Sequence, residues 1–156
     1  MLTIRKATSA DAVDTWNIRA LSVLAACVNH YPTAALSTWV DGAPGEKWAR
    51  LVESGFYLVE EADLIVGTGM LTLSNGQVDA IFVRPSHMGR GVGRTMLDFL
   101  ESRAISNGIA TIRLDSTLNA APFYRRCGWS GEKISIYKSP RGIDLACVPM
   151  TKRVIG

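Results

Sequence analysis

The chain has 156 residues, 47% of them hydrophobic and 20% charged, which is the composition of a folded globular protein rather than a disordered one. This length fits a single domain over residues 1–156. The net charge of +3 arises from 17 basic and 14 acidic residues without any run of Lys or Arg, so we expect no nucleic-acid partner.

Cys27, Cys127 and Cys147 are odd in number and share no metal-ligand spacing, so we expect neither a disulfide framework nor a metal site. The opening "MLTIRKATSADAV" does not have the basic-then-apolar pattern of a secretory leader. The longest apolar tract, residues 20–28, is too short to cross a bilayer. We therefore expect a cytoplasmic protein with no membrane partner.

The first third of the chain reads as one strand followed by helices. "LTIRKA" (2–7) alternates as a strand does, and apolar residues then recur at helical intervals over residues 11–29. "YPTAALSTWV" (31–40) and "GEKWARLVE" (45–53) predict two short helices, because "DGAPG" separates them. Thr8 or Ser9 is a suitable cap for the first helix.

Strands dominate the middle of the chain. "FYLVEE" (56–61), "DLIVGTGMLTL" (63–73) and "QVDAIFV" (77–83) are rich in β-branched and aromatic residues, and Asn75-Gly76 is a strong hairpin signal. A helix is then predicted from Val92 to Ser106, and "ATIRLD" (110–115) predicts a strand parallel to residues 77–83 because a helix connects the two.

The chain closes with a short helix over "NAAPFYRRC" (119–127), with Asn119 as its cap, and a hairpin of "KISIYK" (133–138) and "DLACVPM" (144–150). These elements predict an α+β fold with a mixed, mostly antiparallel central sheet, one parallel strand pair and helices on both faces.

Three glycines, Gly89, Gly91 and Gly93, lie between the strand 77–83 and the next helix. They do not form a nucleotide-hydrolase phosphate loop, because Arg94 and Thr95 stand where that motif requires Gly and Lys. Their G-x-G-x-G spacing also differs from the G-x-G-x-x-G of a dinucleotide site. Two interpretations remain: an anion site at the N-terminus of the helix, or simply a tight turn.

Two stretches together resemble the GCN5-related N-acetyltransferase (GNAT) family: "VDAIFVRPSHMGRGVGRTMLDFLE" (78–101) and "STLNAAPFYRRCGW" (116–129). The first contains a glycine loop like the family's [RQ]-x-x-G-x-[GA] motif, and the second a short helix with the family's Asn and Tyr. The predicted order of elements is similar to that family over the whole chain. Met88 departs from the pattern, because Arg or Gln is usual there, so one side-chain contact to the cofactor is in doubt.

The resemblance implies acetyl-coenzyme A as acyl-donor co-substrate. The backbone of Ile81, Phe82 and Val83 would pair with the pantetheine arm, and Asn119 would lie near the thioester. The pyrophosphate would be held by backbone amides of the loop and first helical turn, that is by Met88, Gly89, Arg90, Gly91, Val92, Gly93, Arg94 and Thr95.

Transfer to an amine needs an acid for the leaving thiolate and a base for the amine, which is mostly protonated at neutral pH. Tyr124 matches the family's acid, although a core tyrosine beside Phe123 is the alternative interpretation. Asp79 is the leading candidate for the base, because it lies on the same strand face as Gln77, where many relatives have a glutamate. Asp115 and Glu60 are lesser candidates.

The family usually builds its acceptor pocket between the N-terminal helices, where His30 and Tyr31 lie. Trp39 and Trp48 fall on helical spacing and favour the core. The resemblance thus implies an N-acetyltransferase acting on a primary amine of a small molecule or peptide, by direct attack in a ternary complex. The alternative is a non-catalytic acyl-coenzyme A sensor. Dimers are common in the family, so a homodimer is compatible with the resemblance.

Overall fold

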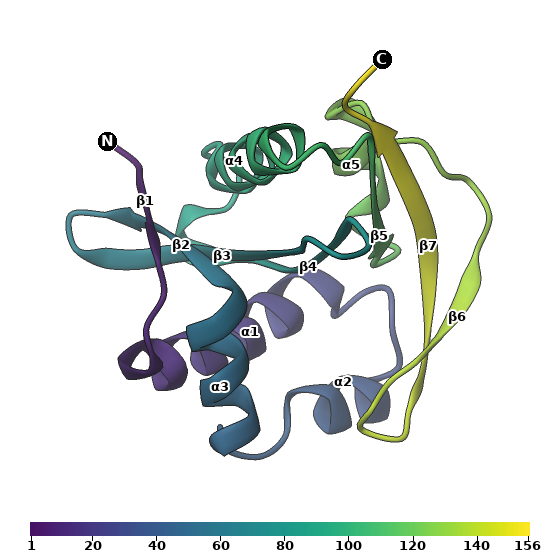
Figure 1. The fold of residues 1–156 in the computed structure, drawn as a ribbon. Helices are drawn as coiled ribbons and strands as arrows, with labels where there is room; N and C mark the ends of the chain where they lie inside the picture. Colours follow the sequence, from purple (N-terminus) through teal and green to yellow (C-terminus); the bar gives the residue numbers. More distant parts are fainter.

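The computed structural model describes residues 1–156 as one twisted sheet with helices on both faces (Figure 1). The seven strands lie in the order β1-β2-β3-β4-β5-β7-β6. Their bounds are β1 (Thr3–Lys6), β2 (Phe56–Glu61), β3 (Leu64–Thr72), β4 (Gln77–Val83), β5 (Thr111–Ser116), β6 (Ser135–Lys138) and β7 (Asp144–Arg153). All neighbours are antiparallel except β4 and β5, which confirms the predicted mixed sheet with one parallel pair.

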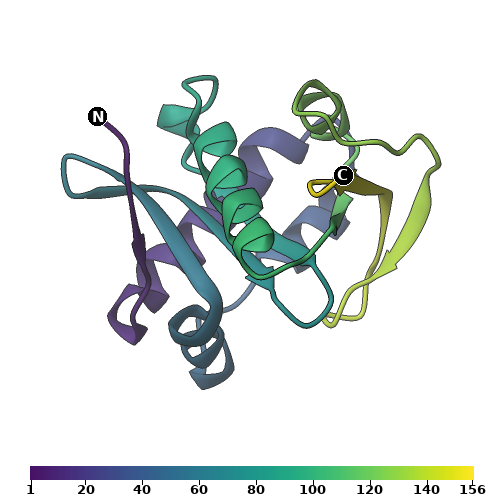
Figure 2. The ribbon, with the colours of Figure 1, turned by 45° about the horizontal axis from the view of Figure 1, so that its top comes forward.

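Helices α1, α2 and α3 cover one face of the sheet, and α4 and α5 cover the other (Figures 1 and 2). Their bounds are α1 (Ala12–Cys27), α2 (Thr33–Val40), α3 (Glu46–Gly55), α4 (Val92–Ser106) and α5 (Ala121–Arg126), with short 3₁₀ turns at Ser9–Asp11 and Pro85–His87. Each helix lies where the apolar periodicity predicted one. No helix combines the length and the apolar character needed to span a bilayer.

The largest part of the core lies between the sheet and α4. Val92, Met96, Leu100 and Ala104 recur at four-residue intervals and are all almost completely buried, as the helical stripe predicted. Strand β3 has Gly67 and Gly69 directly beneath them: a Cβ at Gly67 would lie 2.6 Å from Val92 Cγ1, and one at Gly69 would overlap Met96 Cγ. These two glycines therefore let the first turn of α4 approach the sheet closely.

Strands β4 and β5 diverge soon after they begin. They pair only at Gln77↔Arg113, although β4 continues to Val83. A bulge in β4 adds to the divergence: Ala80 has φ +56°, the register with β3 shifts between Thr68 and Met70, and the Thr68 hydroxyl donates to the Ala80 carbonyl at 2.6 Å. The wedge between the two strands opens toward the N-terminus of α4 and the helix α5.

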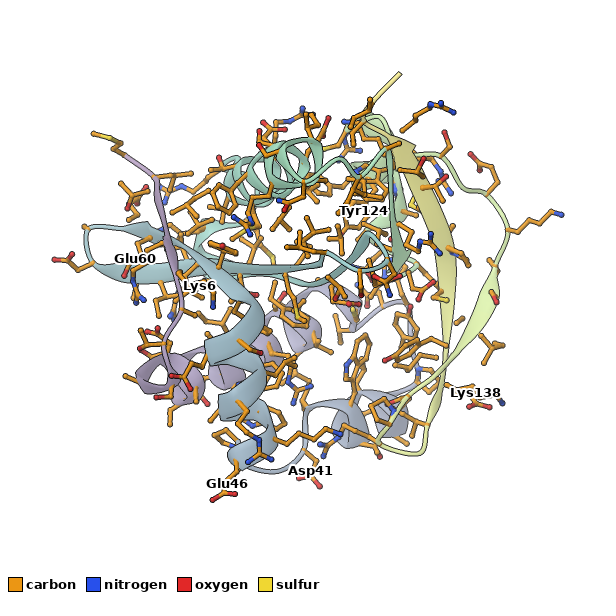
Figure 3. All side chains as sticks on the ribbon, viewed as in Figure 1. Lys6, Asp41, Glu46, Glu60, Tyr124 and Lys138 are labelled. Atoms are coloured by element: carbon orange, nitrogen blue, oxygen red, sulfur yellow. The ribbon has the colours of Figure 1, made fainter.

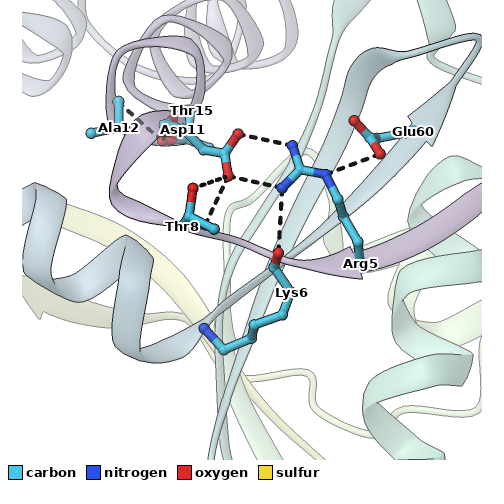
Figure 4. A network of polar contacts seen from close by, with 7 residues as sticks. All are labelled: Arg5, Lys6, Thr8, Asp11, Ala12, Thr15 and Glu60. Carbon is cyan, nitrogen blue, oxygen red and sulfur yellow. Dashed lines mark hydrogen bonds and ion pairs between the residues drawn. The ribbon is translucent and has the colours of Figure 1, made fainter.

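A polar network fixes the corner between β1 and α1 (Figure 4). Both terminal nitrogens of Arg5 donate to the carboxylate of Asp11 at 2.9 Å, and Arg5 Nε lies 3.0 Å from Glu60. The amide of Thr8, the residue that precedes the 3₁₀ turn, donates to the same carboxylate at 2.8 Å. The guanidinium of Arg5 is the main cause that lowers the pKa of Asp11.

Candidate active site

The glycine loop exposes a run of free backbone donors. Gly89 and Gly91 have φ values of +75° and +83°, in the left-handed region that favours glycine, and a Cβ on either would meet nothing within 4 Å. The N–H groups of residues 89–94 donate to no acceptor in the protein, whereas the Thr95 amide closes the first helical bond onto the Gly91 carbonyl at 2.9 Å. Free donors converging at a helix N-terminus form an anion-binding concavity.

Two expectations about this loop need correction. Met88 and Thr95 do not have free amides, because Met88 donates to the Pro85 carbonyl at 3.3 Å and Thr95 to the Gly91 carbonyl, so the free donors run only from Gly89 to Arg94. Gly93 has a packing role as well: a Cβ there would lie 3.2 Å from the Phe123 ring, so the glycine lets α4 lie close to α5. Two of the three glycines, Gly89 and Gly91, are therefore needed for their positive φ values, and Gly93 is needed for close packing.

A cavity of about 360 Å³ runs from this loop into the wedge between β4 and β5. It contains most of the residues expected to bind the cofactor, namely Ile81, Phe82, Val83, Met88, Gly89, Gly91, Val92, Gly93, Arg94 and Asn119. Arg90 and Thr95 do not line it. Because β5 has already diverged, the edge of β4 at residues 81–83 faces the cavity without a partner strand. We refer to this space as the donor cavity.

Asn119 has a different local role from the one predicted. The helix α5 takes Ala120 as its N-cap residue, without a side-chain cap, and Asn119 Oδ1 instead accepts a hydrogen bond from Cys27 Sγ at 3.3 Å. Burial raises the pKa of the Cys27 thiol to about 11, so the thiol keeps its proton at neutral pH and remains a donor. The contact orients the Asn119 amide at the wall of the donor cavity.

A second cavity of about 240 Å³, which we call the acceptor cavity, adjoins the first. It lies between β4, β5 and β7, with α2 and β6 at its rim, and it is lined mainly by apolar and aromatic side chains. Ile81, Phe82, Trp39, Thr117, Ala120 and Tyr124 belong to both cavities.

Tyr124, a buried residue of α5, lies at this junction (Figure 3). Its side chain is only 7% exposed and packs against Phe123 and Trp129, so it does belong to the core cluster. Its hydroxyl, however, has no hydrogen-bond partner in the protein, and its oxygen is not completely buried. Burial raises the pKa of Tyr124 well above its usual value, which keeps the phenol protonated. A protonated donor therefore faces the passage between the cavities.

Asp79 lines the acceptor cavity together with Asp115. Burial raises the pKa of Asp79, a hydrogen bond from Gln77 opposes that effect, and the charge of Asp115 adds to it. Glu60, the other carboxylate considered as a base, lies outside both cavities and pairs with Arg5 at 3.0 Å.

The two residues expected to contact the acceptor are placed differently. The ring of Tyr31 lines the acceptor cavity, but its hydroxyl is already used: it donates to the Ala146 carbonyl at 2.5 Å and accepts from the Leu118 amide at 3.1 Å. His30 is exposed and lines neither cavity. Tyr31 thus braces the loop after β5 against β7, and His30 has no place at the site.

Several lining residues were not predicted to belong to the site. Trp39 and Trp48 both pack against core clusters, as expected, but Trp39 also lines both cavities. Tyr137, from the distant strand β6, forms part of the acceptor cavity, and Arg126 from α5 forms part of the donor cavity. No local sequence pattern marks these residues, because only the packing of α2, α5 and β6 around the wedge brings them there.

Comparison with known proteins agrees with this geometry. The family model described as an acetyltransferase (GNAT) domain matches residues 53–130, which is half of the chain. No curated protein matches by sequence.

Among solved structures, the fold is similar to the GCN5-related N-acetyltransferase "Aminotransferase, Class-II" from Rhodopseudomonas palustris, with a TM-score of 0.88, 26% identity, and coverage of 97% of this chain and 94% of that one. It is also similar to the PaiA N-acetyltransferase from Thermoplasma acidophilum in complex with coenzyme A, with a TM-score of 0.73, 16% identity and coverage of 98% and 99%. The ribosomal-protein-S18-alanine N-acetyltransferase from Escherichia coli has a TM-score of 0.67 and 17% identity, over 100% and 96% of the two chains.

Proposed function

This chain belongs to the GNAT acetyltransferase family, and from that premise we propose that it transfers the acetyl group of acetyl-coenzyme A to a primary amine by direct attack in a ternary complex. The observation that carries the proposal is the Tyr124 hydroxyl, which is buried, protonated and free of partners between two cavities. Two adjoining cavities allow donor and acceptor to be present together, which direct transfer requires.

The donor cavity suits acetyl-coenzyme A, which the acetyltransferases of this family use as donor. The free amides of residues 89–94 match the oxygens of a diphosphate, and Arg94 and Arg126 add positive charge. The unpaired edge of residues 81–83 offers backbone groups to the amides of a pantetheine arm. Met88 reaches the cavity without a charged side chain, so the backbone donors carry the binding. The bound donor supplies a thioester whose carbonyl carbon the amine attacks.

Tyr124 acts as the general acid in this proposal. Forming the new C–N bond breaks the C–S bond, and the departing sulfur takes up a proton. A thiol has a pKa of about 8.5 in water, and its thiolate is a poorer leaving group in an apolar cavity. Because burial raises the pKa of Tyr124, the phenol retains a proton to donate over the whole neutral range.

Asp79 acts as the general base. The amine must lose a proton to attack, and Asp79 is a carboxylate in the same cavity as the Tyr124 ring. Its raised pKa brings it closer to the operating pH than that of a fully solvated aspartate, which favours proton transfer in both directions. The ammonium form of the amine loses one proton to Asp79 before it attacks, and its nitrogen loses a second proton as the C–N bond forms. Tyr124 donates its proton to the departing sulfur, and the second nitrogen proton restores the phenol, so the net reaction releases one proton through Asp79.

The substitution Tyr124→Phe tests this proposal, with thiol release from acetyl-coenzyme A measured against a panel of amines. We expect kcat to fall by about 10²–10³-fold, because a positioned acid contributes roughly that factor. Affinity for coenzyme A should change by less than about twofold.

Tyr57→Phe is the matched control, because Tyr57 packs on Phe99 outside both cavities, and its turnover should equal that of the wild type. Wild-type protein that binds acetyl-coenzyme A but releases no thiol with any amine would favour a non-catalytic sensor instead. Unchanged turnover in Tyr124→Phe would remove Tyr124 from the reaction.

A further inference from the structure

The two cavities carry opposite charge. The donor cavity is lined by Arg94, Arg126 and His87 and by no carboxylate. The acceptor cavity is lined by Asp79 and Asp115 and by no Lys, Arg or His. This separation exists although the chain as a whole has a net charge of +3. The acceptor cavity is therefore a local negative region in a positively charged protein, and it favours cations.

The topology places the two carboxylates opposite each other. Gln77 on β4 pairs with Arg113 on β5, and two residues further along each strand come Asp79 and Asp115, on the faces that these partners share. Both side chains line the acceptor cavity, and the charge of Asp115 contributes to raising the pKa of Asp79, so the two carboxylates lie near each other there.

No cation of the protein neutralises this pair. The ion pairs of the chain lie elsewhere, and Arg113 makes none with Asp115 although it lies on the same face of β5. Lys138, which follows Tyr137 on β6, points to the outer edge of the molecule and pairs with Asp144 at 3.1 Å (Figure 3). Asp79 and Asp115 are both exposed at the open side of the cavity, and neither has a counter-ion from the protein.

Aromatic rings complete the walls. Tyr137 is close enough to both carboxylates for their charges, in addition to burial, to raise the pKa of its phenol. Tyr31, Trp39 and Tyr124 form other parts of the lining. Ring faces beside carboxylates are a favourable environment for an ammonium group, because the ring quadrupole attracts cations.

A second observation ties the carboxylates to a ligand. Tyr124 is 7% exposed, its hydroxyl has no hydrogen-bond partner in the protein, and the residue lines the same cavity. A single amine entering as its ammonium ion balances one carboxylate and leaves the other uncompensated. The cavity volume of about 240 Å³ is below the range of roughly 300–1,000 Å³ typical for drug-sized ligands, so it suits a short molecule.

We propose that the acceptor is a small dicationic amine. One amino group reacts beside Tyr124 and Asp79, and the second remains an ammonium ion held by Asp115 next to the Tyr137 ring. This inference rests on the proposed acetyl transfer and names its substrate class. The second ammonium group takes no part in bond making, so its contribution is to affinity and orientation.

Calorimetric binding to the coenzyme A-loaded protein tests the inference with three probes of similar length: 1,5-diaminopentane, n-pentylamine and 6-aminohexanoate. We expect the diamine to bind about tenfold more tightly than the monoamine, which corresponds to about 1.4 kcal/mol. The aminocarboxylate should bind most weakly, because its negative end meets Asp115. Asp115→Asn should reduce the preference for the diamine to about twofold or less.

Asp144→Asn is the matched control, since it removes a nearby surface carboxylate that already pairs with Lys138, and it should leave the preference unchanged. Equal binding of the monoamine and the diamine, or an undiminished preference in Asp115→Asn, overturns the inference. Thiol-release assays with the same probes separate the two proposals. Selective binding of the diamine without thiol release keeps this site and rejects acetyl transfer, whereas equal turnover of all three amines keeps acetyl transfer and rejects this site.

Discussion

The substitution Gly91→Ala tests how the glycine loop binds a diphosphate. Gly91 has φ +83° and is the N-cap residue of α4, immediately before Val92, so its conformation sets the direction of the neighbouring free amides. A Cβ added at this residue would have no atom within 4 Å, so the substitution causes no clash with neighbours. Its whole effect comes from the backbone, because an L-residue in the left-handed region costs about 1–2 kcal/mol.

Gly108→Ala is a matched control at the other end of the same helix. Gly108 has φ +72° and also has nothing within 4 Å of its Cβ position, so the same backbone cost applies. Both variants should therefore lose about 1–2 kcal/mol in free energy of unfolding. Only Gly91→Ala should disturb the free donors of residues 89–94.

The two variants should differ in affinity for coenzyme A. Loss of one hydrogen bond to a charged group costs about 1.5–3 kcal/mol, which is a factor of roughly 10–150 in Kd. Isothermal titration should show this loss for Gly91→Ala with coenzyme A, but not with pantetheine, which has no phosphate. If the affinities of the two variants for coenzyme A agree within about twofold, the loop amides do not hold the diphosphate.

Three further results follow from other parts of the molecule. Asp11→Asn should lower the free energy of unfolding at pH 7 by about 2 kcal/mol, since it removes the charge-assisted bonds from Arg5. The pKa of Asp11 is lowered in the folded state, so acid denaturation curves should show this difference from the wild type disappearing as the pH falls through that pKa. Gly69→Ala should cost about 1–3 kcal/mol in urea denaturation, because its Cβ would overlap Met96 Cγ, and an unchanged midpoint would show that α4 can move aside. In pH–rate profiles the wild-type kcat/KM should rise with pH through the raised pKa of Asp79. Asp79→Asn should lower kcat/KM by about 10²-fold or more and abolish this rise. A rise that persists in Asp79→Asn would assign the base to another group.

The sequence was sufficient for the order of the elements and for the sheet. The β-branched and aromatic content of residues 56–83, the Asn75-Gly76 hairpin signal and the helical pattern from Val92 are all local signals, and the structure confirms the strands, the hairpin and the helix. The parallel arrangement of β4 and β5 followed from the helix that connects them. Local patterns predict local structure well, because nearby residues determine it.

The divergence of β4 and β5 was not predictable in the same way. It depends on the bulge at Ala80, a non-glycine residue at φ +56°, and on the Thr68 hydroxyl that holds the Ala80 carbonyl from the neighbouring strand. No residue type at these positions indicates such a bulge. Both cavities are lined by residues of β4 near this bulge, so their lining could be read only from the structure.

The roles of individual side chains also divide into those that local motifs indicate and those that depend on contacts between distant segments. The loop glycines and Tyr124 were singled out because short stretches around them resemble motifs of the GNAT family. Asn119, His30 and Trp39 were assigned roles from position along the chain, yet their surroundings come from distant segments: Asn119 meets Cys27 of α1, and Trp39 reaches both cavities. Tyr137 entered the site from β6, where no motif exists.

A crystal structure of the complex with coenzyme A would examine the donor site and the acid together. We predict that the diphosphate oxygens lie within about 3.2 Å of the amides of residues 89–94, and that the sulfur lies beside the Tyr124 hydroxyl. A diphosphate bound away from those amides, or a sulfur separated from the hydroxyl by intervening protein, would contradict the proposed mechanism.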